Sequence, residues 1–224
     1  MISPDVKKAV GYFGEPKNLK QKLRSWKSQP DGQIKIAIPN KGELSADAVN
    51  LLKQEKIADV ERMGRTYVAR FDDVLIIRAN ASDIPSYVYE GIVDFGITGF
   101  DRLIESRLEL NLLEKLGFGK CRVSLAGLEI PESDVRYFEG YLDGKVVATS
   151  LPQIASSYLK ECNIKAQVRY LKGAVEGSII SGVASAIIDV VSSGRTLAEN
   201  GLREVATILE SEAILIKKPD RASL

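Results

Sequence analysis

Histidine is absent from this chain, cysteine is rare, and no long apolar run occurs. Without histidine there is no Ser-His or Cys-His catalytic pair, no His-ligated zinc site and no imidazole acid or base. The two cysteines, Cys121 and Cys162, form no CxxC motif, so a thiol-rich metal site is excluded and two reduced, buried thiols are expected. No apolar run approaches the roughly 18 residues of a membrane span, and residues 1–8 lack the apolar core of a signal peptide. The sequence therefore predicts a cytoplasmic protein without a membrane partner.

An excess of charge of either sign is also missing. The 224 residues include 31 basic and 30 acidic side chains, for a formal net charge of +1. This balance gives no general reason to expect a nucleic-acid partner. The length allows one large domain or two small ones. Any chemistry must use carboxylates, hydroxyls, lysine, arginine, backbone amides or a bound cation.

Residues 1–32 differ from the rest of the chain because they form a basic arm that contains several prolines. Leu19, Leu23 and Trp26 have the spacing of one helical face, which predicts a short amphipathic helix over 17–28. Such an arm could touch RNA or a membrane, but at this length it more often packs on its own protein or on a partner subunit.

After the arm, predicted strands alternate with predicted helices. The strands are expected at 34–38, 66–70, 74–78, 93–97, 121–126, 145–149, 166–171, 186–191 and 213–217, with a hairpin at Asp72-Asp73. The helices are expected after an N-cap at Ser45, from Ser82-Asp83 with Ile84, Val88 and Ile92 on one face, at 100–106, 153–162 and 174–181, and after Gly194. The alternation predicts α/β architecture with parallel sheet covered on both faces.

Two strand-to-helix turns carry the main candidate site residues. Ser192-Ser193-Gly194-Arg195-Thr196 follows an apolar strand that contains Asp189 and leads into a helix, an arrangement that directs several backbone N–H groups at one point and is typical of an anion site. Asp189 could accept hydrogen bonds from ribose hydroxyls. The alternative is an ordinary helix cap beside a structural carboxylate. The similar layout of 91–103 and 182–197 suggests two α/β lobes that each offer such a turn at a shared cleft.

The second turn, 39–45, contains Lys41, which could meet a phosphate, and Gly42, which permits close approach. The segment 117–122 has two glycines and two cations, so it could contact pyrophosphate or form a hinge between lobes. Arg65 and Arg78 are further cations that could face a cleft or lie singly on the surface.

Together these segments resemble the ATP phosphoribosyltransferase family over about residues 34–216. The resemblance is carried by IAIPNKGELS (36–45), DIPSYV with Gly91, DFGITGFD (94–101), LGFGKCR (116–122), LKGAVE (171–176), DVVSSGRTL (189–197) with Asn200-Gly201-Leu202, and 208–216. It implies a two-lobed α/β fold similar to type II periplasmic binding proteins, in which two strands near 119–126 and 208–217 cross the hinge. The expected divisions are an arm at 1–32, lobe I at 33–118 plus 206–224, and lobe II at 119–205.

The resemblance also implies the first reaction of histidine biosynthesis, in which ATP and 5-phosphoribosyl 1-diphosphate (PRPP) give N1-(5-phosphoribosyl)-ATP and pyrophosphate with Mg²⁺. Lys41 and Arg65 are the expected catalytic residues, and no protein metal ligands are expected. The implied PRPP-binding residues in lobe II are Glu176, Asp189, Ser192, Ser193, Gly194, Arg195 and Thr196. The implied ATP- and pyrophosphate-binding residues are Lys41, Gly42, Glu43, Arg65, Arg78, Asp94, Thr98 and Gly99.

This chain departs from the family pattern in ways that affect function. The family usually has arginine at the position of Glu43, so a cation near pyrophosphate has become an anion, and a catalytically weakened or merely ligand-binding relative is the alternative. The chain ends at Leu224 without room for the roughly hundred-residue regulatory domain of the long form. The expectation is therefore the short form, a homo-oligomer (dimer or higher) that works with a regulatory subunit resembling histidyl-tRNA synthetase. The arm at 1–32 is expected to cover an apolar face of its own protein.

Overall fold

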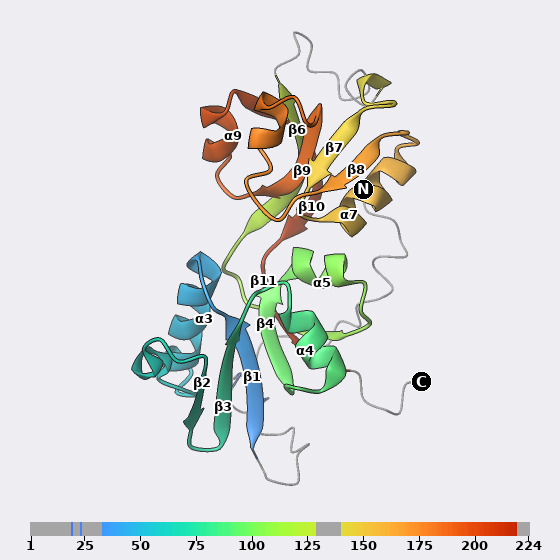
Figure 1. Cartoon of the computed structure of the whole chain (residues 1–224). Coiled ribbons are helices and arrows are strands. Elements are labelled where there is room, and N and C mark those ends of the chain that lie inside the picture. The colour runs from blue at the N-terminus through green and yellow to red at the C-terminus, as the bar shows by residue number, and fades with distance from the viewer. Residues whose placement is uncertain (1–18, 20–22, 24–32, 129–139, 219–224) are drawn as a thin grey trace. The chain divides into compact units, whose positions relative to one another are not determined.

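The computed structural model describes residues 33–128 and 140–218 together with Leu19 and Leu23 (Figure 1). The described residues divide into two compact units: unit 1 contains residues 120–128 and 140–211, and unit 2 contains Leu19, Leu23 and residues 33–119 and 212–218. The chain therefore passes from one unit to the other at Gly119–Lys120 and back at Ser211–Glu212. None of the helices in these described parts is long and apolar enough to cross a bilayer.

Unit 2 is built on a six-stranded mixed sheet with the order β2-β3-β1-β4-β11-β5. Its central strands β1, β3 and β4 are parallel, while β2 and β11 run antiparallel to their neighbours. The strands are β1 (Ile34–Pro39), β2 (Val68–Phe71), β3 (Val74–Ala79), β4 (Phe95–Gly99), β5 (Asn111–Lys115) and β11 (Ala213–Lys217). The helices are α3 (Glu43–Gln54), the 3-10 helix η1 (Val60–Met63), α4 (Ile84–Glu90) and α5 (Phe100–Ser106).

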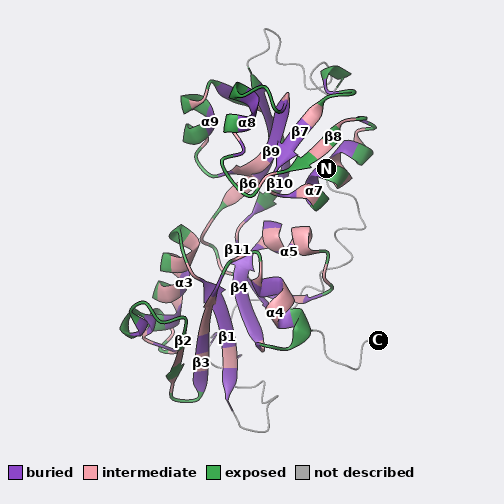
Figure 2. Cartoon of the chain, viewed as in Figure 1, coloured by how far each residue is buried: buried purple, intermediate pink, exposed green. Residues whose placement is uncertain are grey.

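Strict alternation along the strands of unit 2 produces two cores, one on each face of the sheet. Ile36 and Ile38 of β1 pack with Leu52 of α3 on one face, whereas Ala37 between them packs with Val88 of α4 on the other. This is the period of two expected of a strand that is buried on both faces. Figure 2 shows the burial concentrated along these strands.

Unit 1 is built on a five-stranded sheet with the order β10-β6-β9-β7-β8. Strand β7 is parallel to β8 and β9, whereas β6 is antiparallel to β9 and β10. Helices α8 and α9 pack on one face, and α7 contacts β8. The strands are β6 (Cys121–Leu128), β7 (Val146–Thr149), β8 (Gln167–Tyr170), β9 (Ala186–Val191) and β10 (Leu202–Ser211), and the helices are α7 (Pro152–Glu161), α8 (Gly177–Ile180) and α9 (Arg195–Glu199).

The two-lobed α/β fold is confirmed, and so is the two-residue hairpin turn, in which Phe71 of β2 pairs with Val74 of β3. The sheet of unit 2 is parallel only at its centre and that of unit 1 only on the side of β9, β7 and β8, so the prediction of parallel sheet was too simple. Strands β5 and β10 had not been predicted. The second passage between units lies at 211/212, later than the boundary expected at 205/206, because β10 pairs with β6 from Leu202 to Ser211.

Two helix boundaries differ from the sequence prediction for local reasons. Helix α3 begins at Glu43 with Gly42 as its N-cap, so the prediction of Ser45 as the cap was wrong. Gly42 has φ 78°, a left-handed value that suits glycine and allows the chain to enter the helix three residues earlier. Helix α4 ends at Glu90 with Gly91 in the left-handed conformation, so Ile92 lies beyond the helix and is exposed. Helix α8 is also shorter than the predicted 174–181.

Candidate functional site

The carboxyl ends of three parallel strands bring the predicted PRPP residues of unit 1 to one edge of its sheet. Ser150 follows β7, the segment 171–176 follows β8, and the segment 192–196 follows β9. Ligands of open α/β sheets bind at such an edge. Asp189 lies near the end of β9, and its Oδ1 accepts a hydrogen bond from the hydroxyl of Ser150 at 2.8 Å. Glu176 is half-buried at the start of α8.

The segment Ser192–Thr196, here called the 192–196 turn, is a largely exposed segment made of the loop after β9 and the first two residues of the short helix α9. Gly194 is its N-cap with φ 78°, which strains any residue with a side chain. The backbone N–H of Arg195 donates to Ser193 Oγ at 3.3 Å, so part of the turn is held by its own hydroxyl. The Arg195 guanidinium is exposed and lies 3.6 Å from Glu199 Oε1. The turn therefore presents backbone amides, hydroxyls and one cation to its surroundings.

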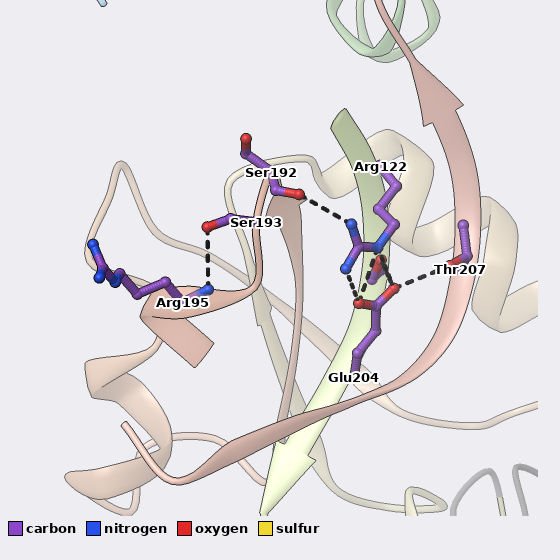
Figure 3. Close-up of polar contacts among 7 residues, drawn as sticks. Arg122, Ser192, Ser193, Arg195, Glu204 and Thr207 are labelled. Carbon is purple, nitrogen blue, oxygen red and sulfur yellow. Dashed lines mark hydrogen bonds and ion pairs between the residues drawn. The ribbon is translucent and has the colours of Figure 1, made fainter. Parts of the chain in front are cut away.

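A network of polar side chains on β6 and β10 lies beside the Ser192 end of the 192–196 turn (Figure 3). Arg122 Nε donates to Glu204 Oε1 at 2.7 Å and to Oε2 at 2.9 Å, and Nη2 also donates to Oε2. Arg122 Nη1 donates to the backbone carbonyl of Ser192 at 3.0 Å. Glu204 Oε1 also accepts from the hydroxyls of Ser124 at 2.8 Å and Thr207 at 3.0 Å.

These bonds make the Glu204 carboxylate a fixed charge. The hydrogen bond from Arg122, followed by those from Ser124 and Thr207, lowers the pKa of Glu204 from 4.5 to about 2. The same bond to Glu204 raises the pKa of Arg122 above its usual value. The sequence had suggested Arg122 as a pyrophosphate contact or hinge residue, but it gave no sign of Ser124, Ser150, Glu204 or Thr207. Ser124 and Ser150 bind partners far away in the sequence, and Thr207 joins the network only because Glu204 beside it meets Arg122.

In unit 2, the carboxyl ends of β1, β3 and β4 form a comparable edge. Lys41, Gly42 and Glu43 follow β1 and are exposed, while Arg78 lies near the end of β3 and Thr98-Gly99 end β4. The loops are linked by polar contacts: Asn40 Nδ2 donates to Asn80 Oδ1 at 3.4 Å, and Asn80 Nδ2 donates to Asp83 Oδ2 at 3.0 Å.

Two of the predicted nucleotide-binding residues at this edge use their polar atoms to hold neighbouring backbone. Arg78 Nη1 donates to the carbonyl of Gly64 at 2.7 Å, and Nη2 donates to that of Val60 at 3.3 Å. Arg65, the residue after Gly64, is exposed. The hydroxyl of Thr98 is fully buried and donates to the carbonyl of Ala81 at 2.7 Å. Arg78 thus anchors the segment that carries Arg65, and Thr98 anchors the loop between β3 and α4.

Asp94 is not brought to this edge. It precedes β4, so it lies at the amino end of the strand, where its Oδ2 accepts a hydrogen bond from the backbone N–H of Lys35 at 2.8 Å. The length of a five-residue strand, about 16 Å, separates it from the edge that carries Lys41. Gly117 and Gly119 of the 117–122 segment both have positive φ next to the first passage between units.

The described residues contain no group of three or more Cys, Asp or Glu side chains that could hold a metal ion. Mg²⁺ commonly needs only one or two carboxylates when substrate phosphates and water supply its remaining oxygen ligands. Glu176 and Asp189, on the edge that carries the 192–196 turn, are carboxylates of this kind.

Comparison with known proteins gives a consistent result. The family model described as ATP phosphoribosyltransferase matches residues 80–224. An ATP phosphoribosyltransferase from Methanopyrus kandleri is 41% identical over 189 residues, which cover 84% of this chain and 66% of that protein. Another from Aquifex aeolicus is 36% identical over 188 residues, which cover 84% of this chain and 86% of that protein. The chain thus spans slightly less than two thirds of the length of the first relative and most of the second.

Solved structures extend the comparison to the fold. The ATP phosphoribosyl transferase (HisG:HisZ) complex from Thermotoga maritima contains a chain that is 26% identical, with a TM-score of 0.67 and coverage of 84% of this chain and 88% of that one. A substrate binding protein of an amino acid ABC transporter matches with a TM-score of 0.53 at 13% identity over 85% of this chain and 87% of that one, a similarity of fold alone.

Proposed function

Because this chain belongs to the ATP phosphoribosyltransferase family, we propose that it transfers the 5-phosphoribosyl group of PRPP to N1 of ATP and releases pyrophosphate, the first step of histidine biosynthesis. A bond forms between adenine N1 and ribose C1, and the bond from C1 to the diphosphate oxygen breaks. The observation that carries this proposal is the edge of unit 1, where a glycine-containing turn with exposed amides and hydroxyls follows Asp189 on the same strand.

On the PRPP side, the 192–196 turn would bind the 5′-phosphate and Asp189 would accept hydrogen bonds from ribose hydroxyls. Phosphate is suited to such a turn because backbone N–H groups and hydroxyls both donate to its oxygens. The positive φ of Gly194 supports this assignment because it bends the backbone without a side chain in the way. Glu176 follows β8 at the same edge, and we assign it to the PRPP side as well.

On the ATP and pyrophosphate side, Lys41, Gly42 and Arg65 are the residues that we assign to direct contact. Lys41 and Arg65 are exposed cations, and we propose that they stabilise the negative charge that accumulates as pyrophosphate leaves C1. Arg78 and Thr98 would act by holding the adjacent loops, as their hydrogen bonds support. Gly99 follows Thr98, and Glu43 is exposed next to Gly42.

The reaction suits a chain without histidine. Adenine N1 carries a free lone pair, so its attack needs no strong general base. The difficult event is the departure of pyrophosphate while the ribose develops positive charge, and cations with backbone amides assist this event. We propose that Mg²⁺ enters with the diphosphate of PRPP. The sequence had given no reason to expect a protein ligand for it, but the place of Glu176 at this edge makes that carboxylate the candidate protein ligand, while Asp189 serves the ribose hydroxyls. When bound, Mg²⁺ would neutralise diphosphate charge.

The Thermotoga maritima structure is a complex of HisG with a second protein, HisZ, and this suggests a partner for this chain. We propose that this chain also binds a regulatory subunit of that kind and forms a homo-oligomer.

The direct test is to mix the purified protein with ATP, PRPP and Mg²⁺ and to follow N1-(5-phosphoribosyl)-ATP by absorbance, with and without the candidate regulatory subunit. We expect product that depends on all three additions. Asp189→Asn and Arg65→Ala should each lower kcat/KM about 100-fold if they act as proposed. Lys165→Gln, which removes an exposed cation just before β8, at the edge of the unit 1 sheet opposite the 192–196 turn, is the control and should leave the rate unchanged. ATP binding without product under either condition would contradict the proposal.

A further inference from the structure

All three nitrogens of the Arg122 guanidinium, which lies beside the Ser192 end of the 192–196 turn, donate to protein acceptors. Its Nε and Nη2 both bind the Glu204 carboxylate, and its Nη1 binds the Ser192 carbonyl at 3.0 Å. This two-pronged pairing with a carboxylate fixes the plane of the guanidinium. The charge of Arg122 is therefore balanced by Glu204, and each of its nitrogens already donates a hydrogen bond.

Glu204 is itself held from two strands. Its Oε1 accepts from Ser124, which is fully buried on β6, and from Thr207 on β10. The side chains of Arg122 and Glu204 are only 29% and 23% exposed, so water competes less for this pair than for an exposed one. The network is therefore a rigid support attached to the strand pair β6–β10 at one side of the sheet.

The contact with Ser192 sets the direction of a peptide group in the turn. In a trans peptide the C=O of one residue and the N–H of the next point in opposite directions. Because the Ser192 carbonyl points to Arg122, the N–H of Ser193 points away from it. The guanidinium also packs against the turn, since a Cβ on Gly194 would lie 3.8 Å from Arg122 Nη2. If the peptide flipped, a carbonyl oxygen would replace this N–H.

We propose that Arg122 and Glu204 are positioning residues that form a clamp: they hold the Ser192 carbonyl so that the amides of the 192–196 turn face the 5′-phosphate of PRPP. This inference rests on the proposed function, because the clamp matters to activity only if the turn binds a phosphate. Arg122 acts on the phosphate through the turn, and Glu204 acts through Arg122.

Glu204→Gln separates this role from direct phosphate binding by Arg122. If Arg122 contacted the phosphate, loss of the neutralising carboxylate would strengthen PRPP binding. If Arg122 is a clamp, Glu204→Gln loosens it and raises the KM for PRPP about tenfold, with kcat and the KM for ATP changed less than about twofold. Arg122→Gln should have the same effect, and Arg122→Lys should not restore wild-type behaviour because an ammonium group cannot form the paired contact.

The two residues should act as a unit. The double variant Arg122→Gln/Glu204→Gln is expected to raise the KM for PRPP no more than the more severe single variant, since either change alone already releases the carbonyl. Thermal melting reports whether each variant folds. If Arg122→Gln does not fold, Ser124→Ala and Thr207→Val serve in its place. Each removes one hydroxyl that donates to Glu204 and should give a smaller increase in the KM for PRPP.

A measurement on the free protein tests the clamp without catalysis. In Arg122→Gln and Glu204→Gln, backbone order parameters from ¹⁵N relaxation should fall at residues 192–195, from about 0.85 towards 0.6. Lys165→Gln removes an exposed cation at the opposite edge of the same sheet and should leave both the order parameters and the KM for PRPP unchanged. Unchanged values in Arg122→Gln, or tighter PRPP binding by Glu204→Gln, would overturn the proposal. Absence of PRPP binding by the wild-type protein would instead count against the proposed function, and the order parameters would still decide the clamp.

Discussion

At the scale of single residues, Glu43 combines a favourable local role with an unfavourable position for pyrophosphate. It is an exposed carboxylate in the first turn of α3, two residues after Lys41. A negative charge stabilises the N-terminus of a helix because the helix dipole is positive there. The same charge would repel pyrophosphate bound near Lys41. The family resemblance leads us to expect arginine at position 43 instead.

Glu43→Arg is therefore expected to increase kcat/KM about tenfold at low salt, since it replaces a repulsive charge by an attractive one. Added salt should reduce the gain, because the site is exposed and screened. Thermal stability should fall slightly, as a cation in the first helical turn opposes the dipole. Steady-state kinetics at two ionic strengths with differential scanning calorimetry measure both effects.

Glu55→Arg is the control for this substitution. It makes the same change in net charge at the C-cap of α3, ~18 Å along the helix from Glu43, and should leave the rate unchanged. An equal gain in both variants would point to a general charge effect, and a loss of rate in Glu43→Arg alone would mean that the carboxylate has a role of its own.

At the scale of elements, the segment 60–64 depends on β3 for its position. Its carbonyls at Val60 and Gly64 accept hydrogen bonds from Arg78, and the next residue is Arg65. We therefore expect Arg78 to affect the proposed nucleotide site through this segment, without contact with a ligand.

Arg78→Gln should lower the melting temperature, because two carbonyls lose charged donors, a change of about 1–3 kcal/mol. It should also lower kcat/KM to the level of Arg65→Ala, and the double variant should be no worse than the more severe single variant. Arg78→Lys should not rescue the activity. The matched control is Arg70→Gln on the neighbouring strand β2, where the guanidinium donates to Gln33 at 3.2 Å. Rescue by lysine would instead indicate direct contact between residue 78 and a phosphate.

At the scale of the whole molecule, the predicted arm contributes to the core of unit 2. Leu19 and Leu23 are helical, 6% and 3% exposed, and belong to the same core as Leu52 and Phe95. The remainder of the arm, including Trp26, lies outside the described residues. Two leucines at this spacing agree with one buried face of the helix expected over 17–28.

Leu23→Ala should therefore destabilise the protein as a core substitution does, by about 2–5 kcal/mol, and lower its melting temperature by about 5–15 °C. Deletion of residues 1–32 should lower it further. Ile92→Ala removes a comparable side chain that is 45% exposed and should change the melting temperature little. A melting curve for Leu23→Ala that matched the wild type would reject the arm as part of the core.

Much of the architecture follows from local patterns. The alternation of Ile34–Ile38, the turn at Asp72-Asp73 and the glycine at 194 each depend on neighbours within a few residues, and their elements were predicted correctly. The short edge strand β5 and the strand β10 escaped prediction because they have weak patterns of their own and are stabilised by pairing with β11 and β6.

The sequence by itself determined the chemistry available to this protein, its strand-to-helix turns and its family, because these reside in residue types and short spacings. Only the tertiary structure decided which side chains support those turns. Arg122 and Glu204 are 82 positions apart, and they meet because β6 and β10 are neighbours in the sheet. The sequence led us to predict Asp94 and Lys41 as members of one nucleotide-binding site. Strand direction instead places Asp94 at the amino end of β4, whereas Lys41 follows the carboxyl end of the neighbouring parallel strand β1. Strand order and direction are properties of the whole sheet, so no local pattern reveals them.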